Sequence, residues 1–382
     1  MRKFEGLKNM ITQRRRFGAA ASTLVLVLVL MKCSEEMVSA EYRYRYGVSS
    51  VFVFGDSLVD VGNNNFLHSA ARANFYPYGV DYHAGPTGRF SNGQTVIDMF
   101  VDMLRIPNAP EFANPDTTGD KILHGVNYAS AAAGILDETG RHYGERYSLS
   151  QQVVNFENTV SDLRRTMSSG NLTNYLCKSI AFLAFGSNDY INNYLMPTLY
   201  NSRLRYTAPQ FANLLLNHYA RQLLALQSMG LRKFVVAGVG PLGCIPNQRA
   251  TGLGLPGRCV DNVNQMLGDF NEGLRSLVVQ LNTQNPDSTF VYTNVYGIFG
   301  DILNNPDTYG FRVVDTACCG VGQNRGVITC LPLQFPCLNR NEHVFWDAFH
   351  PTEAASAVLA GRAFRGPPSD SYPINIQQLA LI

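Results

Sequence analysis

The sequence predicts an α/β fold, a three-layer α/β/α sandwich around a mostly parallel sheet. Short apolar runs that suit buried strands alternate along the chain with longer segments of helical period, an arrangement typical of βαβ units. Apolar residues at successive positions favour parallel strands that helices cover on both faces. Ligands of such sheets bind beyond the carboxyl ends of the strands, so the residues that follow each predicted strand are the first candidates for a functional site.

Four apolar stretches are predicted as strands, at residues 51–54, 180–185, 233–237 and 289–292. The clearest predicted helix covers 261–281, where apolar residues recur every three or four positions and Asp261 suits the N-cap. Another covers 209–229, because Pro209 suits the first helical position and Gly230 suits a C-terminal stop.

The first forty residues have the layout of a secretory signal peptide. Basic residues come first, an apolar block covers 18–31, and Val38-Ser39-Ala40 supplies small residues for cleavage. The apolar block is shorter than the roughly eighteen residues expected of a membrane-spanning helix. We therefore expect a signal peptide at 1–40, a secreted chain without a stable membrane span, and a single domain at 41–382.

The charge of the chain indicates no nucleic-acid partner. The whole chain of 382 residues has a net charge of +2. Residues 41–382 hold 24 basic and 26 acidic side chains, which gives −2 for the expected mature protein. The basic surplus therefore belongs to the signal peptide.

Seven cysteines follow the signal peptide, so at least one is left without a partner inside the chain. Cys244 and Cys259 enclose a loop rich in glycine and proline and are expected to form one bridge. Four more cysteines between 318 and 337 can clip a second loop. A zinc site is the alternative, but no C-x-x-C pair occurs, so no metal is expected. Asn171-Leu172-Thr173 is a predicted N-glycosylation site.

Two small polar residues come directly after predicted strands. Ser57 follows the first strand in Gly55-Asp56-Ser57, which places it where substrates bind. The alternative is that Asp56 and Ser57 cap a helix. Asn188 has the corresponding place after the second strand, and its side-chain amide can donate to a developing oxyanion. Its alternative is an ordinary turn residue.

A histidine with a carboxylate three residues earlier is the candidate base. Pro351 suits the first position of a helix and leaves His350 just outside it. Asp347 is close enough in sequence to reach the imidazole ring and set its tautomer. His343 is a competing histidine, but its nearest acid, Glu342, is adjacent and tends to point elsewhere.

Two glycine-containing stretches have competing interpretations. Gly134 ends a run of small residues and can expose its backbone N–H to a substrate, although the run suits tight packing equally well. Residues 238–243 read G-x-G-x-x-G after a predicted strand, which is the pattern of a dinucleotide site. The dinucleotide interpretation fails because Pro241 and Pro246 are expected to keep this region in a loop until the helix at 261 begins.

Taken in order, these stretches resemble the GDSL-type esterases and lipases of the SGNH hydrolase superfamily, in particular its large secreted plant branch. GDSLVDVGNNN at 55–65, GVNYASAAAGILDETG at 125–140, GSNDY at 186–190 and DAFHP at 347–351 resemble the first, second, third and fifth sequence blocks of that family. GRFSNG at 88–93 and GVGPLGCIPNQ at 238–248 are also typical of the plant branch. The resemblance covers residues 50–365 and implies a flavodoxin-like SGNH hydrolase fold.

The resemblance also implies a role for each candidate residue. Ser57 corresponds to the nucleophile, His350 to the general base and Asp347 to the residue that orients the base. The backbone N–H groups of Ser57 and Gly134 and the side chain of Asn188 correspond to the oxyanion hole. Family members form an acyl-enzyme that water or another alcohol resolves. The chain supplies every one of these groups, so no cofactor or metal is expected.

The implied function is a secreted carboxylic ester hydrolase that acts on a small-molecule, lipid or polymer ester. We expect it in the apoplast or cell wall, with an endomembrane compartment as the alternative. Two other functions stay open at this point. An acyltransferase would use the same site and resolve the acyl-enzyme with an alcohol, and a secreted binding protein would use the same scaffold without catalysis.

Overall fold

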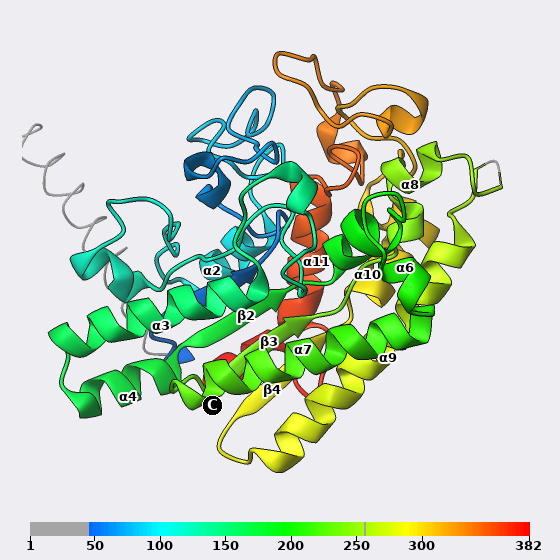
Figure 1. Cartoon of the computed structure of the whole chain (residues 1–382). Coiled ribbons are helices and arrows are strands. Elements are labelled where there is room, and N and C mark those ends of the chain that lie inside the picture. Colours follow the sequence, from blue (N-terminus) through cyan, green and yellow to red (C-terminus); the bar gives the residue numbers. More distant parts are fainter. Residues whose placement is uncertain (1–45, 256) are drawn as a thin grey trace, which may run out of the picture. The chain divides into compact units, whose positions relative to one another are not determined.

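The computed structural model describes residues 46–255 and 257–382. Residues Val48–Ile382 form one compact unit, in which a sheet lies between two layers of helices (Figure 1). The predicted three-layer α/β/α sandwich is confirmed. The predicted signal peptide at 1–40 lies outside the described residues and stays a prediction.

The sheet formed by the described residues has five strands in the order β1-β2-β3-β4-β5. These strands are β1 (Val51–Gly55), β2 (Ile180–Ala184), β3 (Lys233–Ala237), β4 (Thr289–Thr293) and β5 (Ser371–Tyr372). The first four are parallel, and the short β5 runs antiparallel to β4. Each predicted strand forms within one residue of its expected bounds, and β5 was not predicted because two residues carry no periodic signal.

A further extended segment covers the outer edge of β1. The Val53 N–H donates to the Val126 carbonyl, and the Tyr128 N–H donates to the Val53 carbonyl, so residues 126–128 run parallel to β1. With this segment included, β1 lies between two neighbours, which is the flavodoxin-like strand arrangement.

Helices cover both faces of the sheet (Figure 1). One face carries α3 (Leu149–Thr166), α4 (Ser169–Lys178), α7 (Ala208–Ser228) and α9 (Asp261–Gln284). The other carries α2 (Val96–Leu104), α10 (Val295–Asn304), α11 (Glu353–Arg365) and α12 (Ile376–Leu381). The connections between these elements contain three short helices, α5 (Ser187–Asp189), α6 (Ser202–Arg205) and α8 (Pro246–Ala250). Helix α5 continues directly into a π-helical turn at Tyr190–Tyr194. Short 3-10 helices lie at Asn63–Phe66, Gly119–His124, Arg141–Tyr143, Leu242–Cys244, Pro306–Tyr309, Gln323–Arg325 and Arg340–Glu342.

The ends of the helices differ slightly from the predicted ones. The N-cap of α9 is Val260, and Asp261 is its first helical residue. In α7, Thr207 forms the cap by a reciprocal capping box with Gln210, so the helix begins one residue before Pro209. Capping side chains reach backbone N–H groups two or three residues away, and this geometry decides the first helical residue.

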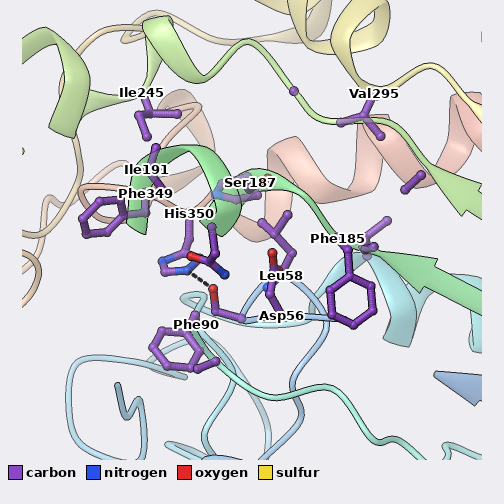
Figure 2. Close-up of a pocket in the computed structure, with 18 of the residues that line it drawn as sticks. Asp56, Leu58, Phe90, Phe185, Ser187, Ile191, Ile245, Val295, Phe349 and His350 are labelled. Carbon is purple, nitrogen blue, oxygen red and sulfur yellow. Dashed lines mark hydrogen bonds between the residues drawn. The ribbon is translucent and has the colours of Figure 1, made fainter. Parts of the chain in front are cut away.

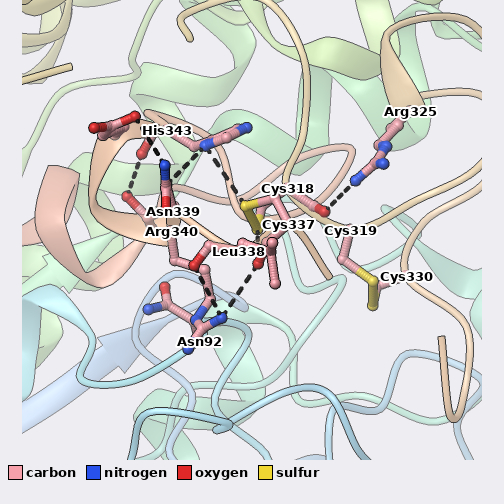
Figure 3. The surroundings of a disulfide bond; sticks show 12 residues. Asn92, Cys318, Cys319, Arg325, Cys330, Cys337, Leu338, Asn339, Arg340 and His343 are labelled. Atoms are coloured by element: carbon pink, nitrogen blue, oxygen red, sulfur yellow. Dashed lines mark hydrogen bonds between the residues drawn. A yellow bond between two sulfur atoms is a disulfide. The ribbon is translucent and has the colours of Figure 1, made fainter. Parts of the chain in front are cut away.

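Three disulfides are present in the described part of the chain. Cys244 pairs with Cys259 as predicted. The four later cysteines pair as Cys318–Cys337 and Cys319–Cys330, one bridge nested within the other, as Figure 3 shows. Among the described cysteines, Cys177 is free. The prediction that these four cysteines close a second loop is confirmed.

Candidate active site

The carboxyl ends of β1 and β2 bring Ser57 and Asn188 to the same edge of the sheet. Gly55 and Ala184 are partners in the register of the two strands, so the residues that follow them lie side by side. Gly186 makes the turn after β2 with φ of 113°, a conformation that a side chain rarely allows. Gln152 fixes the turn after β1, because its side-chain amide accepts from the N–H of Gly55 at 2.9 Å and donates to the Gly55 carbonyl at 2.8 Å.

Ser57, His350 and Asp347 form a continuous hydrogen-bonded chain. The Nε2 of His350 lies 2.7 Å from the Oγ of Ser57, and the Nδ1 of His350 lies 2.8 Å from both carboxylate oxygens of Asp347. Figure 2 shows the bond between His350 and the serine hydroxyl. A carboxylate only accepts, so Nδ1 carries the proton and leaves Nε2 as the acceptor for the serine hydroxyl.

Hydrogen bonds within the loop that carries Asp347 and His350 fix its conformation. The backbone N–H groups of Phe349 and His350 both donate to Oδ1 of Asp347, at 2.9 and 2.8 Å. The helix α11 begins later than predicted, at Glu353, because Thr352 is its N-cap and accepts from Ala355. His350 therefore lies in an extended segment before the cap, further from the helix than the sequence predicts.

Tyr78 contacts Asp347 of this hydrogen-bonded chain, and it was not among the predicted site residues. Its hydroxyl donates to Oδ2 of Asp347 at 2.6 Å. Its ring packs edge-on against Phe90 and Trp346. Phe90 in turn lies against the imidazole of His350, with 5.0 Å between ring centroids. Tyr78 is far from Asp347 in sequence, so no local spacing could have indicated the contact.

The Asp347 carboxyl is held in its charged form inside the protein. Burial alone would raise its pKa. The charge of His350 and hydrogen bonds from His350, Tyr78 and Phe349 together outweigh burial and hold the pKa of Asp347 below its usual value. The carboxylate can therefore serve as a fixed negative partner for the imidazole.

The side-chain amide of Asn188 has a defined orientation. Its Nδ2 donates to the Ala133 carbonyl at 2.9 Å, and its Oδ1 accepts from Nδ2 of Asn192 at 2.6 Å. The two contacts determine which end carries the hydrogens. One N–H of Asn188 is thereby used, and the second is available to the cavity that Asn188 lines together with Ser57.

Gly134 and Ala132 lie differently relative to the cavity around Ser57. Gly134 is absent from the described residues that line the cavity around Ser57. A Cβ at this position would meet Thr139 and Asp189, so the side of Gly134 that a side chain would occupy faces the protein interior. Ala132 lines the cavity in its place, in the left-handed conformation with φ of 65°. Alanine rarely adopts this conformation, so the sequence carried no sign of it.

Buried carboxyl groups brace the loops behind the site. Burial raises the pKa of Asp56 to about 7 and the pKa values of Asp60 and Asp189 to about 6. Asp60 accepts from the N–H of Ala131 at 3.1 Å, and Asp189 accepts from the N–H of Ile135 at 2.8 Å. These contacts tie the segment around Ala132 to the loops that carry Ser57 and Asn188.

Two alternatives from the sequence remain, the competing histidine His343 and the G-x-G-x-x-G stretch at 238–243. The ring of His343 contacts the Asn339 carbonyl and the Cys337 sulfur, beside the loop closed by the Cys318–Cys337 disulfide (Figure 3). In the G-x-G-x-x-G stretch, Gly238, Gly240 and neighbouring residues line the cavity around Ser57. This stretch was predicted to be loop throughout, but it leads into a 3-10 turn at Leu242–Cys244 and the short α8.

Within residues 46–255 and 257–382, no group of three or more His, Cys, Asp or Glu side chains is arranged to hold a metal ion. None of the helices over the same residues combines the length and the apolar composition that crossing a membrane requires.

The sequence was compared with models of known protein families. A family model described as GDSL-like lipase/acylhydrolase matches residues 51–363. The chain belongs to this family. The predicted resemblance is confirmed over nearly the whole described part of the chain.

Curated relatives in the GDSL family agree with this assignment. One GDSL esterase/lipase of Arabidopsis thaliana is 59% identical over 98% of this chain and 100% of its own length. A second from the same plant is 55% identical over 87% of both chains, and GDSL esterase/lipase 7 is 50% identical over 86% of this chain and 91% of its own. This GDSL family member is accordingly a carboxylic ester hydrolase.

Proposed function

We propose that the protein is a secreted serine esterase or lipase that hydrolyses carboxylic esters through an acyl-enzyme on Ser57. The observation that carries the proposal is the 2.7 Å contact between the Ser57 hydroxyl and His350, whose other ring nitrogen lies 2.8 Å from Asp347. A weak hydroxyl nucleophile is activated in this way when a base stands within hydrogen-bond reach and a third group orients the base.

In the proposed reaction, Ser57 Oγ attacks the carbonyl carbon of the ester and passes its proton to His350 Nε2. The carbonyl oxygen becomes an oxyanion. The bond to the alcohol oxygen then breaks, and His350 returns the proton to the departing alcohol. Water attacks the acyl carbon in the second half, again losing a proton to His350, and the acid leaves when Ser57 regains its hydrogen.

Three N–H donors are proposed for the oxyanion. They are the backbone N–H of Ser57, the free N–H of the Asn188 amide and the backbone N–H of Ala132. Among the described residues, the N–H groups of Ser57 and Ala132 donate to no other group, and both residues line the cavity with Asn188. The proposal therefore gives Ala132 the role that the resemblance implies for Gly134.

A serine-directed fluorophosphonate tests the nucleophile. We expect a single adduct in the intact mass of the folded protein, mapped to Ser57 and missing from Ser57→Ala. The absence of an adduct on folded protein would favour the binding-protein alternative.

The relative losses of two variants test the assigned roles. Asn188→Ala should lower turnover by on the order of 10²- to 10³-fold, since it removes one oxyanion donor. Ser57→Ala removes the covalent route and should cost far more. Equal residual rates in the two purified, folded variants would contradict the assignment.

An acyltransferase would use the same groups and differs only in what resolves the acyl-enzyme. Product analysis with water and candidate alcohols in competition separates the two functions. Free acid as the main product at moderate alcohol concentration supports hydrolysis, and a dominant transfer product would replace it with acyl transfer.

Secretion to the apoplast or cell wall is proposed from three features. The sequence begins with the signal-peptide pattern, the described residues hold three disulfides, and Asn171 of the glycosylation sequon is exposed on α4. Disulfides persist in oxidising compartments. Expression in a plant cell should yield protein in the medium that begins after Ala40 and loses mass on removal of N-glycans, and intracellular retention would contradict this.

A further inference from the structure

We propose that the loop at residues 318–338, the docking loop, binds the surface of a phospholipid bilayer that carries anionic headgroups. Two nested disulfides close this loop (Figure 3), which lies at the top of Figure 1 in orange. Its exposed apolar side chains, its charge and its contact with the cavity around Ser57 support this role. The surface is separate from the groups that break the ester, so the inference goes beyond the proposed function.

Exposed apolar side chains are concentrated on the docking loop. Of the eighteen large apolar side chains that are exposed in the described part of the chain, six lie within residues 327–338. These six are Val327, Ile328, Leu331, Leu333, Phe335 and Leu338. Leu333 is 77% exposed, Phe335 86% and Leu338 91%. Single exposed apolar residues are ordinary on a protein surface, but a cluster marks a place of contact with another protein or with lipid.

The docking loop directs its polar groups inward and its apolar side chains outward. The Leu331 N–H donates to the side-chain oxygen of Gln334 at 3.1 Å. The side-chain nitrogen of Gln334 donates to the Gly320 carbonyl at 2.7 Å, which joins the two halves of the loop. Together with the disulfides, these bonds restrict the loop while its apolar side chains stay in water. A restricted loop of this kind is suited to insertion into a lipid surface, where buried apolar area drives binding.

The charge of the loop suits a negatively charged surface. Residues 316–341 contain Arg325 and Arg340 and no aspartate or glutamate. Arg340 forms an ion pair with Asp81. Arg325 is exposed, and its guanidinium contacts the Cys318 carbonyl at 2.7 Å, so its charge is not neutralised there by a carboxylate. Anionic headgroups attract a basic side chain near the surface, and no carboxylate within this stretch opposes them.

The docking loop also reaches the cavity around Ser57. Thr329 lines that cavity, and its hydroxyl lies 3.3 Å from the hydroxyl of Tyr78. The Leu333 N–H donates to the Tyr76 carbonyl at 2.8 Å, so the loop packs along the segment that carries Tyr78. Binding of the loop to a bilayer would therefore bring the cavity next to the lipid.

A second copy of the chain is the competing partner for this surface. Protein interfaces combine an apolar centre with polar groups that form hydrogen bonds across the contact. The six exposed apolar side chains of the docking loop offer no such groups, whereas a lipid surface requires none from them. We therefore assign the loop to lipid and treat self-association as an outcome of the test.

Sedimentation with lipid vesicles tests the assignment. Ser57→Ala is the host protein, so that no lipid is hydrolysed and binding is measured apart from catalysis. We expect the host to sediment with vesicles of phosphatidylcholine and phosphatidylglycerol, and to bind vesicles of phosphatidylcholine alone more weakly. Phe335→Ser in this host should lower the partition coefficient about tenfold, because the ring no longer enters the lipid. Arg325→Gln should remove the preference for phosphatidylglycerol.

Leu204→Ser is the matched control. Leu204 is 79% exposed and lies on α6, outside the docking loop, so its replacement removes a similarly exposed apolar side chain from another element. Vesicle binding by this variant should equal that of the host. With Ser57 intact, Phe335→Ser should keep the urea stability of the unmodified protein and its rate on a water-soluble acetate ester, because Phe335 is exposed and does not line the cavity.

Several results would overturn the proposal. No binding to either kind of vesicle, or equal binding by the host and Phe335→Ser, would exclude the loop as a lipid-binding surface. Equal binding to both kinds of vesicle would exclude anionic headgroups as its partner. A dimer in light scattering that becomes monomeric in Phe335→Ser would assign the loop to self-association. Vesicle binding by a protein that hydrolyses no ester would instead count against the proposed function alone.

Discussion

Replacing Tyr78 with phenylalanine tests whether one buried hydroxyl stabilises the charged form of Asp347. The hydroxyl donates to the carboxylate at 2.6 Å, and both residues are buried. The tyrosine ring packs against Phe75, Phe90 and Trp346. Phenylalanine keeps these ring contacts, so the change is confined to the hydroxyl and its hydrogen bonds, the short one to Asp347 and a longer one to Thr329.

The size of the effect follows from the other donors to the same carboxylate. A hydrogen bond to a charged group contributes about 1.5–3 kcal/mol. Asp347 keeps the N–H groups of Phe349 and His350 and the ring of His350 as donors. We therefore expect Tyr78→Phe to lower the free energy of unfolding by about 1.5 kcal/mol at neutral pH, the lower end of that range.

The effect should depend on pH with a definite sign. The pKa of Asp347 is lowered in the folded protein, because the charge of His350 and the hydrogen bonds outweigh burial. A carboxyl of this kind stabilises the fold above its unfolded pKa of about 3.9, and the stabilisation is lost as pH falls through the folded pKa. The difference between Tyr78→Phe and the unmodified protein should therefore be full at neutral pH and shrink below about pH 4.

Urea unfolding of both proteins over a series of pH values measures this difference. Thr329→Val is a matched control, since the Thr329 hydroxyl lies 3.3 Å from the Tyr78 hydroxyl and, within the described part of the chain, does not contact the Asp347 carboxylate. Its effect should be smaller and independent of pH. A destabilisation by Tyr78→Phe that is the same at every pH, or that is absent at neutral pH, would refute the reasoning.

Further variants probe buried charge elsewhere. Burial raises the pKa of Asp56 to about 7, so this group contributes a loss of stability as pH rises from about 4 to 7, and Asp56→Asn should show a flatter profile than the unmodified protein in unfolding experiments over that window. Arg89→Met breaks the buried pair of Arg89 with Asp98 at 2.7 Å and should cost about 3–5 kcal/mol in urea unfolding. Arg165→Met breaks an exposed pair and should cost less than about 1 kcal/mol, so equal losses in the two arginine variants would contradict the role of burial.

The fold and much of the site were predictable because their signals are local. Apolar runs and helical stripes decide which residues face the interior, and four strands formed within one residue of their predicted bounds. Asp347 and His350 are three residues apart, and their contact closes within a single loop. Ser57 and Asn188 were indicated by their places directly after strands, where parallel sheets bind ligands.

Contacts between distant parts of the chain were decided by the tertiary structure. The Tyr78 contact to Asp347 joins residues 269 positions apart, and the nested pairing of the later cysteines depends on how their loop is folded. The left-handed backbone of Ala132 and its place beside Ser57 have no sign in its side chain, so the sequence could not indicate this residue as a donor. The row of small side chains at the carboxyl ends of β2 and β3 arises from register, because Ala184 and Ala237 become neighbours only when their strands are paired. The periodicity of the sequence predicts which side chains face the interior. The pairing and register of the strands, however, depend on segments that meet only in the folded chain.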